Sequence, residues 1–296
     1  MDTRPLLSND WFLDQMISTD APGKSALDSR SKELRKMIVR TLAAGRRGHV
    51  GAAFSVVEIL RVLYDRILKY DPKNPRWKDR DRCILSKGHG CLALYVLLAE
   101  KGFFPEAELW KFCARDGILG GHPEYGKVPG IEASTGSLGH GLSIGVGFAL
   151  AAKLDGEDPG KRRVFVIVGD GECSEGSIWE AALCAAKHRL SRLTVLIDYN
   201  KQQTYGSIAE VQGLEPLVEK WASFGFAVRE VNGHDVEALA NVLGGVPFAA
   251  DKPSAIICHT VKGKGVSFTE RNLGWHHKAR TTEAEEASLL AELDTD

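Results

Sequence analysis

Two runs of consecutive apolar residues, each followed at once by polar residues, place the strongest constraint on the fold of this chain. The first run, Val164 to Val168, leads into Gly169-Asp170-Gly171-Glu172. The second run, Leu193 to Ile197, leads into Asp198-Tyr199-Asn200. Strands that are buried on both faces of a parallel sheet have this composition. We therefore predict two buried strands with polar residues at their carboxyl ends.

The distance between the two runs indicates how the strands are connected. Residues 172 to 199, which are 28 in number, separate Gly171 from Asn200. This length accommodates one helix, one loop and the second strand, as in a parallel crossover. Two neighbouring parallel strands would bring Asp170 and Asn200 side by side, in the region beyond the strand ends where ligands bind in such sheets.

The rest of the chain alternates between short β-rich runs and helical stretches, which predicts an α/β fold with a mostly parallel sheet covered by helices on both faces. The expected strands are 83–85, 164–168, 193–198, 227–231 and 255–259, and the expected helices are 90–101, 140–154, 177–188 and 235–244. We expect an N-terminal arm over residues 1–25, one domain over 26–280 and an acidic helical tail over 281–296.

Two further helices are expected before the first strand. Leu34, Ile38 and Leu42 repeat every four positions and indicate an amphipathic helix within 26–45. Ser55 followed by Glu58 has the spacing of a capping box and predicts a helix over about 56–68.

Composition excludes several classes of function. The formal net charge is −1, with 38 basic and 39 acidic residues, so no overall field attracts nucleic acid or an anionic membrane. No apolar run approaches the roughly 20 residues that a membrane-spanning helix needs. The N-terminus has no signal-peptide pattern, and the six scattered cysteines form no zinc or disulfide pattern. We expect a cytoplasmic protein with small-molecule or protein partners.

Asp170 and Asn200 are candidate metal ligands. A carboxylate and an amide oxygen are hard ligands that suit Mg²⁺ or Ca²⁺ and leave room for phosphate oxygens. Taken alone, Gly-Asp-Gly is also a common turn sequence. The strand before it, the helix after it and the asparagine at this distance favour the metal site.

Gly169-Asp170-Gly171 followed by Asn200 is similar to the thiamine diphosphate signature of transketolases, 2-oxoacid decarboxylases and dehydrogenase E1 subunits. The resemblance implies a thiamine diphosphate-binding fold of the diphosphate-binding (PP) type. It implies that Asp170, Asn200 and the Gln202 carbonyl bind the metal. It also implies that Gly171, with Glu172 and Asn200, binds the cofactor.

Four loops that combine glycine with histidine make the resemblance specific to transketolases, and it extends over residues 26–280. They contain Gly48-His49, His89-Gly90, Gly121-His122 and Gly136-Ser137-Leu138-Gly139-His140. The resemblance places His49, His122 and His276 at the sugar and reaction centre, although the His276-His277 pair leaves either histidine possible. It places His89, Gly136, Ser137 and Leu138 on the cofactor, and Glu175 at a subunit interface between active sites. His140 stands where many transketolases have Gln.

The resemblance implies ketol transfer: a two-carbon unit passes from a ketose or its phosphate to an aldose. Imidazoles suit the proton transfers of this reaction near neutral pH. Transketolases are about twice as long as this chain. We therefore expect a partner chain that carries the pyrimidine-binding domain, in a heterotetramer. The basic residues that hold a sugar phosphate are expected mostly in that partner.

Two alternatives remain open on sequence grounds. One is an E1 α-type subunit of a 2-oxoacid dehydrogenase, which also carries Gly-Asp-Gly and Asn. The other is a non-catalytic homologue that binds the cofactor only. The loops His122-Pro123-Glu124 and Gly136 to His140 disfavour the first alternative. The retention of Asp170, Asn200 and the histidines disfavours the second.

Overall fold

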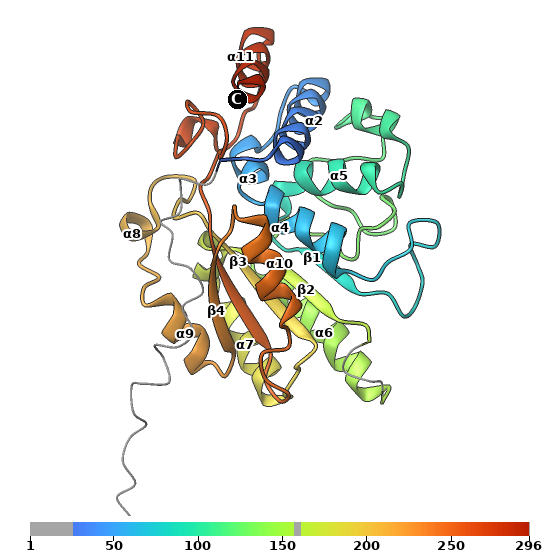
Figure 1. Cartoon of the computed structure of the whole chain (residues 1–296), viewed down its shortest axis with the longest axis vertical. Helices are drawn as coiled ribbons and strands as arrows, with labels where there is room; N and C mark the ends of the chain where they lie inside the picture. The colour runs from blue at the N-terminus through green and yellow to red at the C-terminus, as the bar shows by residue number, and fades with distance from the viewer. Residues whose placement is uncertain (1–25, 157–160, 296) are drawn as a thin grey trace, which may run out of the picture.

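A parallel β-sheet forms the centre of the molecule in the computed structural model, which describes residues 26–156 and 161–295 (Figure 1). Within these residues the strands have the order β1-β2-β3-β5-β4, and all neighbours are parallel. The strands are β1 (Arg82–Leu85), β2 (Val164–Gly169), β3 (Leu193–Tyr199), β4 (Ala227–Asn232) and β5 (Ser254–His259). All of the predicted strands are confirmed, and so is the α/β fold with a parallel sheet. The expected arm over 1–25 lies outside the described residues.

The helices of the described chain surround this sheet. The α-helices are α2 (Ser29–Gly45), α3 (Val50–Ser55), α4 (Val57–Val62), α5 (Cys91–Glu100), α6 (His140–Leu154), α7 (Gly176–Lys187), α8 (Ile208–Val211), α9 (Leu217–Ser223), α10 (Val236–Gly244) and α11 (Glu283–Asp294). Short 3₁₀ turns include η2 (Gly88–Gly90) and η4 (Gly171–Ser174), and a π-helical turn follows α4 over Leu63–Ile67. The short helices α8 and α9 were not predicted.

The alternation of side chains along β2 divides the core into two layers. Val164, Val166 and Val168 pack with α6, α7 and α9 on one face. Phe165 and Ile167 pack with α2, α4, α5 and α10 on the other. Every residue of β2 and β3 is buried, which explains why both strands are continuous apolar runs. The carboxyl ends of β2 and β3 are therefore held in a rigid layer.

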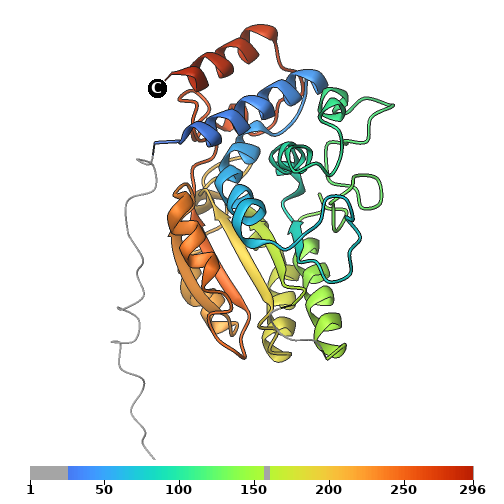
Figure 2. The same cartoon turned by 45° about the vertical axis from the view of Figure 1, so that its right-hand side comes forward.

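The C-terminal helix α11 lies beside α2 at one end of the molecule (Figures 1 and 2). A capping box begins it, because the Thr282 side chain accepts from the Glu285 N–H and the Glu285 carboxylate accepts from the Thr282 N–H. Leu289 and Leu293 are buried against the rest of the chain. The segment predicted as an acidic tail is thus helical and packed.

The predicted capping box at Ser55 and Glu58 is wrong. Ser55 is the last residue of α3, and its hydroxyl donates to the Asp198 carboxylate, 2.7 Å away. Glu58 lies inside α4, where its carboxylate pairs with Arg35. Tertiary partners thus occupy both side chains. Helix α2 begins after Asp28, whose side chain caps it by accepting from the Ser31 N–H at 2.8 Å.

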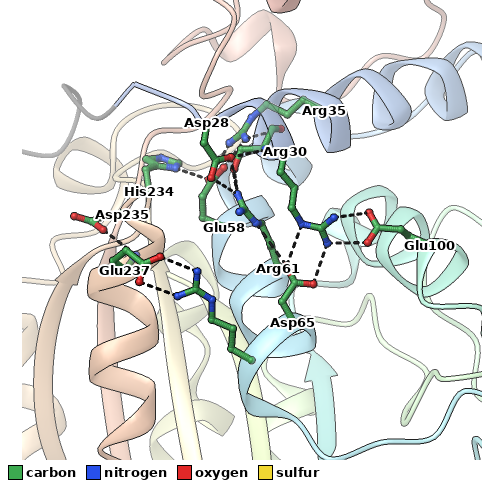
Figure 3. Close-up of polar contacts among 12 residues, drawn as sticks. Asp28, Arg30, Arg35, Glu58, Arg61, Asp65, Glu100, His234, Asp235 and Glu237 are labelled. Atoms are coloured by element: carbon green, nitrogen blue, oxygen red, sulfur yellow. Dashed lines mark hydrogen bonds and ion pairs between the residues drawn. The ribbon is translucent and has the colours of Figure 1, made fainter.

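Ion pairs join α2 to the helices beside it (Figure 3). Arg35 and Glu58 form a fully buried pair, and His234 bonds the same carboxylate at 2.8 Å. Arg61 of α4 donates to Asp28 at 2.6 Å. Because Arg35 also donates to the Lys264 carbonyl, this network connects α2 and α4 with the loop that follows β5.

Two expectations about the class of protein can be compared with the described residues. None of their helices is long and apolar enough to cross a membrane. All six cysteines are described, and each is a free thiol.

Candidate functional site

Asp170 and Asn200 lie at adjacent strand ends. Gly169 of β2 pairs with Asp198 of β3, so the next residues of each strand leave the sheet together. The Asp170 carboxylate accepts from the Gly171 N–H at 2.7 Å and from the Lys201 N–H at 2.5 Å. The predicted convergence of the two strand ends is therefore present.

The donor atoms at these strand ends fit a hard divalent cation. Burial, followed by the nearby Asp198 carboxylate, raises the pKa of Asp170 to about 7. A buried carboxylate of this kind is costly to ionise unless a positive charge lies next to it. The Asn200 amide oxygen accepts only from the Gln202 N–H, at 3.1 Å, and retains a lone pair. No group of three His, Cys, Asp or Glu side chains suited to a metal occurs in the described chain, so amide and carbonyl oxygens would have to complete the ligand set.

Lys87 and Asp198 form a buried ion pair directly beneath these loops. Asp198 also accepts from Ser55, Thr260 and the Asn200 amide, which fixes the orientation of Asn200. Burial alone would raise the pKa of Asp198, but Lys87 and these hydrogen bonds hold it below its usual range. The pair anchors the end of β3 to the loop that follows β1.

Lys262, in the loop that follows β5, adds a second buried cation. Its ammonium donates to the Gln202 carbonyl at 3.2 Å. Burial and the neighbouring Lys87 lower the pKa of Lys262 to about 8. The Gln202 side chain points elsewhere and donates to the Arg271 carbonyl at 2.7 Å. The backbone oxygen of Gln202 therefore faces the Lys262 ammonium.

Five histidines from four loops converge beside this polar site. The ring centre of His49 lies 5.3 Å from His89, 6.2 Å from His122, 5.5 Å from His276 and 4.5 Å from His277. An antiparallel bridge between Gly48 and Lys278 brings the first and last of these loops together. The rings of His276 and His277 therefore both lie beside His49.

Burial lowers the pKa of four histidines of this cluster, namely His49, His89, His122 and His276. Burial, followed by the neighbouring His277, His276 and His122, lowers the pKa of His49 to about 3. Burial and Lys262 lower the pKa of His276 to about 4. The pKa of His122 is also lowered, and that of His89 lies well below its usual value, in both cases mainly through burial. Neutral imidazoles can each accept one proton and donate another.

The loop over residues 135–140 packs against the histidine cluster and the loop that follows β1. Gly136 has φ +139°, and a Cβ there would lie 2.8 Å from the His122 ring. Thr135 donates to the Leu85 carbonyl at 2.8 Å. Ser137 and Leu138 follow at the surface of the same loop. This close approach of backbone to imidazole requires glycine.

Glu172 joins three of these loops. Its carboxylate accepts from Ser86 at 2.5 Å, from the Gly139 N–H at 2.8 Å and from the Gly169 N–H at 3.0 Å. Burial raises the pKa of Glu172 against the effect of these bonds. Both carboxylate oxygens of Glu172 are therefore hydrogen-bonded to protein groups.

Glu175 lies apart from the histidine cluster. It precedes α7, is exposed, and would contact a side chain added at Gly139. His140 is exposed as well, at the first position of α6, where its ring lies 3.3 Å from the Ser137 hydroxyl. These residues are open to a neighbouring molecule.

Several residues of the site were not singled out from the sequence. Lys87 lies within the Ser86-Lys87-Gly88-His89 loop, and Lys262 lies in the Lys-Gly-Lys-Gly segment that follows β5. Both occupy loops after strands, where ligands are expected, so the same positional signal applies to them. Thr204, whose hydroxyl lies 3.2 Å from His276, carries no comparable signal in the sequence.

Comparison with known proteins gives one family. The family described as "Transketolase, thiamine diphosphate binding domain" matches residues 28–293. A 6-deoxy-6-sulfo-D-fructose transketolase subunit of Clostridium sp. (strain MSTE9) is 42% identical over 269 residues, which are 90% of this chain and 96% of the relative. One of the subunits of the apulose-4-phosphate transketolase of Phocaeicola vulgatus is 40% identical over 263 residues, which are 89% and 92% of the two chains.

Solved structures agree with these relatives. Transketolase from Leishmania mexicana superposes with a TM-score of 0.83 at 30% identity, over 93% of this chain and 42% of that chain. Transketolase from Campylobacter jejuni gives a TM-score of 0.83 at 30% identity, over 90% and 42%. This chain therefore spans less than half of the solved enzymes that it resembles.

Proposed function

Because this chain belongs to the family of the thiamine diphosphate-binding domain of transketolases, we propose that it is the diphosphate-binding subunit of a two-chain transketolase. In this reaction a two-carbon ketol unit passes from a ketose, or its phosphate, to an aldose. The observation that carries the proposal is that the polar strand ends and the histidine cluster lie next to each other. The side-chain oxygens of Asp170 and Asn200 lie near the histidine cluster, and the His276 ring lies 3.2 Å from the hydroxyl of Thr204, which is in the same loop as Gln202.

The residues at the strand ends would hold the cofactor and its metal. The Asp170 carboxylate, the Asn200 amide oxygen and the Gln202 carbonyl would bind Mg²⁺ or Ca²⁺. The Gly171 N–H, together with Lys262, would contact the diphosphate. Bound thiamine diphosphate supplies a carbon nucleophile and an electron sink, which the side chains of the protein do not offer.

The histidine cluster would handle protons on the sugars. His49, His122 and His276 are neutral, so each can donate to a carbonyl oxygen or accept a proton from a hydroxyl. His89 would lie on the cofactor side, with Gly136, Ser137 and Leu138 along the cofactor rings. The packing of these loops against one another would limit the freedom of a bound sugar.

A partner chain is part of the proposal. The curated relatives named above are called subunits, and this chain covers 96% and 92% of them but only 42% of the solved transketolases. The partner would carry the pyrimidine-binding domain and a glutamate that acts on the aminopyrimidine. Exposed Glu175 would lie at the interface. A heterotetramer with two-fold symmetry is the simplest assembly.

Reconstitution tests this function. We expect the chain alone to bind thiamine diphosphate with Mg²⁺ but to lack ketol transfer activity. The purified complex with its partner should have that activity. Asp170→Ala should abolish metal-dependent cofactor binding in calorimetry, whereas Asp155→Ala at the exposed end of α6 should not. Full activity of the isolated chain would refute the two-chain arrangement.

The alternatives make different predictions in the same assays. An E1 α-type subunit would turn over a 2-oxoacid in the complex, and none of the relatives named above is of that type. A non-catalytic homologue would bind the cofactor without ketol transfer in any complex. Transfer by the complex, together with its loss in Asp170→Ala, would exclude both.

A further inference from the structure

A pocket of about 550 Å³ opens beside the histidine cluster. His49, His122 and His277 line one side of it, and Arg47, Arg115 and Lys127 also contribute to its walls. The lining residues include these three cations and no carboxylate. A concave site with charges of one sign concentrates ligands of the opposite charge.

The arginines have their charge available. Neither Arg47 nor Arg115 has a hydrogen bond or ion pair with another residue among those that the structure describes, and both are exposed. Lys127 has only a long contact of 3.5 Å with Glu124. Arg30 and Arg61, by contrast, are paired with carboxylates (Figure 3). Unpaired guanidinium groups beside a reaction centre are suited to bidentate recognition of an oxyanion.

Cys113 and Arg47 both line this pocket. Cys113 is a free thiol and is exposed. Burial raises the pKa of this thiol, and the Arg47 guanidinium opposes that rise. The Arg47 charge therefore acts on a group inside the pocket.

We propose that Arg47, Arg115 and Lys127 form a subsite on this chain for the anionic end of the sugar substrate, a terminal phosphate or sulfonate. The inference rests on the proposed function, because it requires that the histidine cluster receives a sugar. It differs from the expectation that the partner supplies most of the basic residues for this group. The histidines would face the reacting end of the sugar, and the cations would select its charged end.

Alkylation of Cys113 tests the charge of the pocket on the chain alone. Anionic iodoacetate and neutral iodoacetamide both react with the thiolate, so the ratio of their rates cancels any change in thiol ionisation. We expect Arg47→Ser with Arg115→Ser to lower the iodoacetate-to-iodoacetamide ratio at Cys113 by roughly threefold or more at low salt. Arg46→Asn is the matched control, because Arg46 is adjacent, lies outside the pocket lining and has φ 55°, which asparagine tolerates. An unchanged ratio in the double variant would overturn the proposal.

Protection of Cys113 distinguishes the two anions. Methyl phosphate and methanesulfonate would be added separately to the same alkylation reaction, with methanol as the uncharged reference. Slowing by methyl phosphate alone would assign a phosphate-selective subsite, and slowing by both would assign a general oxyanion subsite. Protection by neither anion, or equal protection in the double variant, would contradict the assignment.

Kinetics of the complex connect the subsite with substrate choice. Erythrose 4-phosphate and erythrose would serve as paired acceptors. We expect the double variant to lower kcat/KM for the phosphorylated acceptor at least tenfold more than for the neutral one. If wild-type protein transfers to both acceptors and the double variant affects them equally, the subsite is refuted while the proposed function stands. Failure of wild-type protein with every acceptor would instead refute the proposed function.

Discussion

Glu58 and His234, 176 positions apart in the sequence, share a hydrogen bond of 2.8 Å between side chains that are each 1% exposed. The other imidazole nitrogen of His234 accepts from the Val261 N–H at 2.8 Å, so the proton must lie on the nitrogen that faces Glu58. Burial alone would raise the pKa of Glu58, but Arg35 and His234 hold it well below its usual range. The loop that carries Lys262 is thereby tied to α4.

Glu58→Gln should destabilise the protein strongly, because it leaves the Arg35 guanidinium buried without a counter-charge. Breaking one partner of such a pair costs about 3–5 kcal/mol. Urea unfolding of the purified chain measures the loss. Glu237→Gln is the control, since its pair with Arg66 is exposed and its loss should change stability by less than about 1 kcal/mol. Equal effects of the two substitutions would refute this account of the buried pair.

Two glycines in α6 should respond in opposite directions to alanine. A Cβ at Gly141 would lie 2.3 Å from the Ser86 hydroxyl, and overpacking of this kind costs about 1–3 kcal/mol. A Cβ at Gly147 meets nothing within 4 Å, and alanine there should gain roughly 0.5–1 kcal/mol. Thermal melts of both variants test the pair. If Gly141→Ala raised stability, the loop of Ser86 would be able to move away at little cost, and the prediction would be wrong.

His49→Asn should make the free energy of unfolding less dependent on pH below neutrality. The unfolded chain binds a proton on this imidazole near pH 6.5, whereas the folded chain binds it only near pH 3. Between these values protonation favours unfolding, so wild-type stability falls as the pH is lowered. From pH 7 to pH 5 the variant should lose roughly 1–2 kcal/mol less than wild type. Urea titrations at the two pH values measure this, with exposed His188→Asn as control. Parallel profiles for wild type and His49→Asn would contradict the predicted burial of a neutral ring.

Glu172→Gln should weaken cofactor binding although its side chain points into the protein. Its carboxylate accepts three hydrogen bonds, and an amide in its place cannot accept all of them. An unsatisfied buried donor costs about 1–3 kcal/mol, and the loop of Gly139 should shift. We expect the dissociation constant for thiamine diphosphate with Mg²⁺ to rise about tenfold in calorimetry. Exposed Glu180→Gln is the control. Lower stability with unchanged affinity would limit Glu172 to a structural role.

The strands and the convergence of their ends could be predicted because local pattern and tertiary structure agree there. Burial on both faces makes β2 and β3 continuous apolar runs, and the connection length places Asp170 next to Asn200. The capping box at Ser55 and Glu58 failed for the opposite reason. Its local spacing was right, but Asp198 and Arg35 are distant partners that hydrogen-bond the same side chains.

The remaining parts of the site depend on contacts that no local pattern encodes. His277 could not be separated from His276, because only the three-dimensional arrangement shows both rings near His49. Lys87 could be read as part of a glycine-histidine loop, but its pairing with Asp198 joins residues 111 positions apart. The basic residues of the pocket belong to different loops and show no pattern in the sequence.

The bridge between Gly48 and Lys278 also has a consequence for biosynthesis. Each residue accepts a backbone hydrogen bond from the other at 2.9 Å, and the two lie at opposite ends of the described chain. Domains fold as units while the ribosome elongates them from the N-terminus. Nascent chains that end before Lys278 can form most of the sheet. They lack the backbone bridge that brings His276 and His277 to His49. The histidine cluster is therefore completed only after the ribosome has added Lys278.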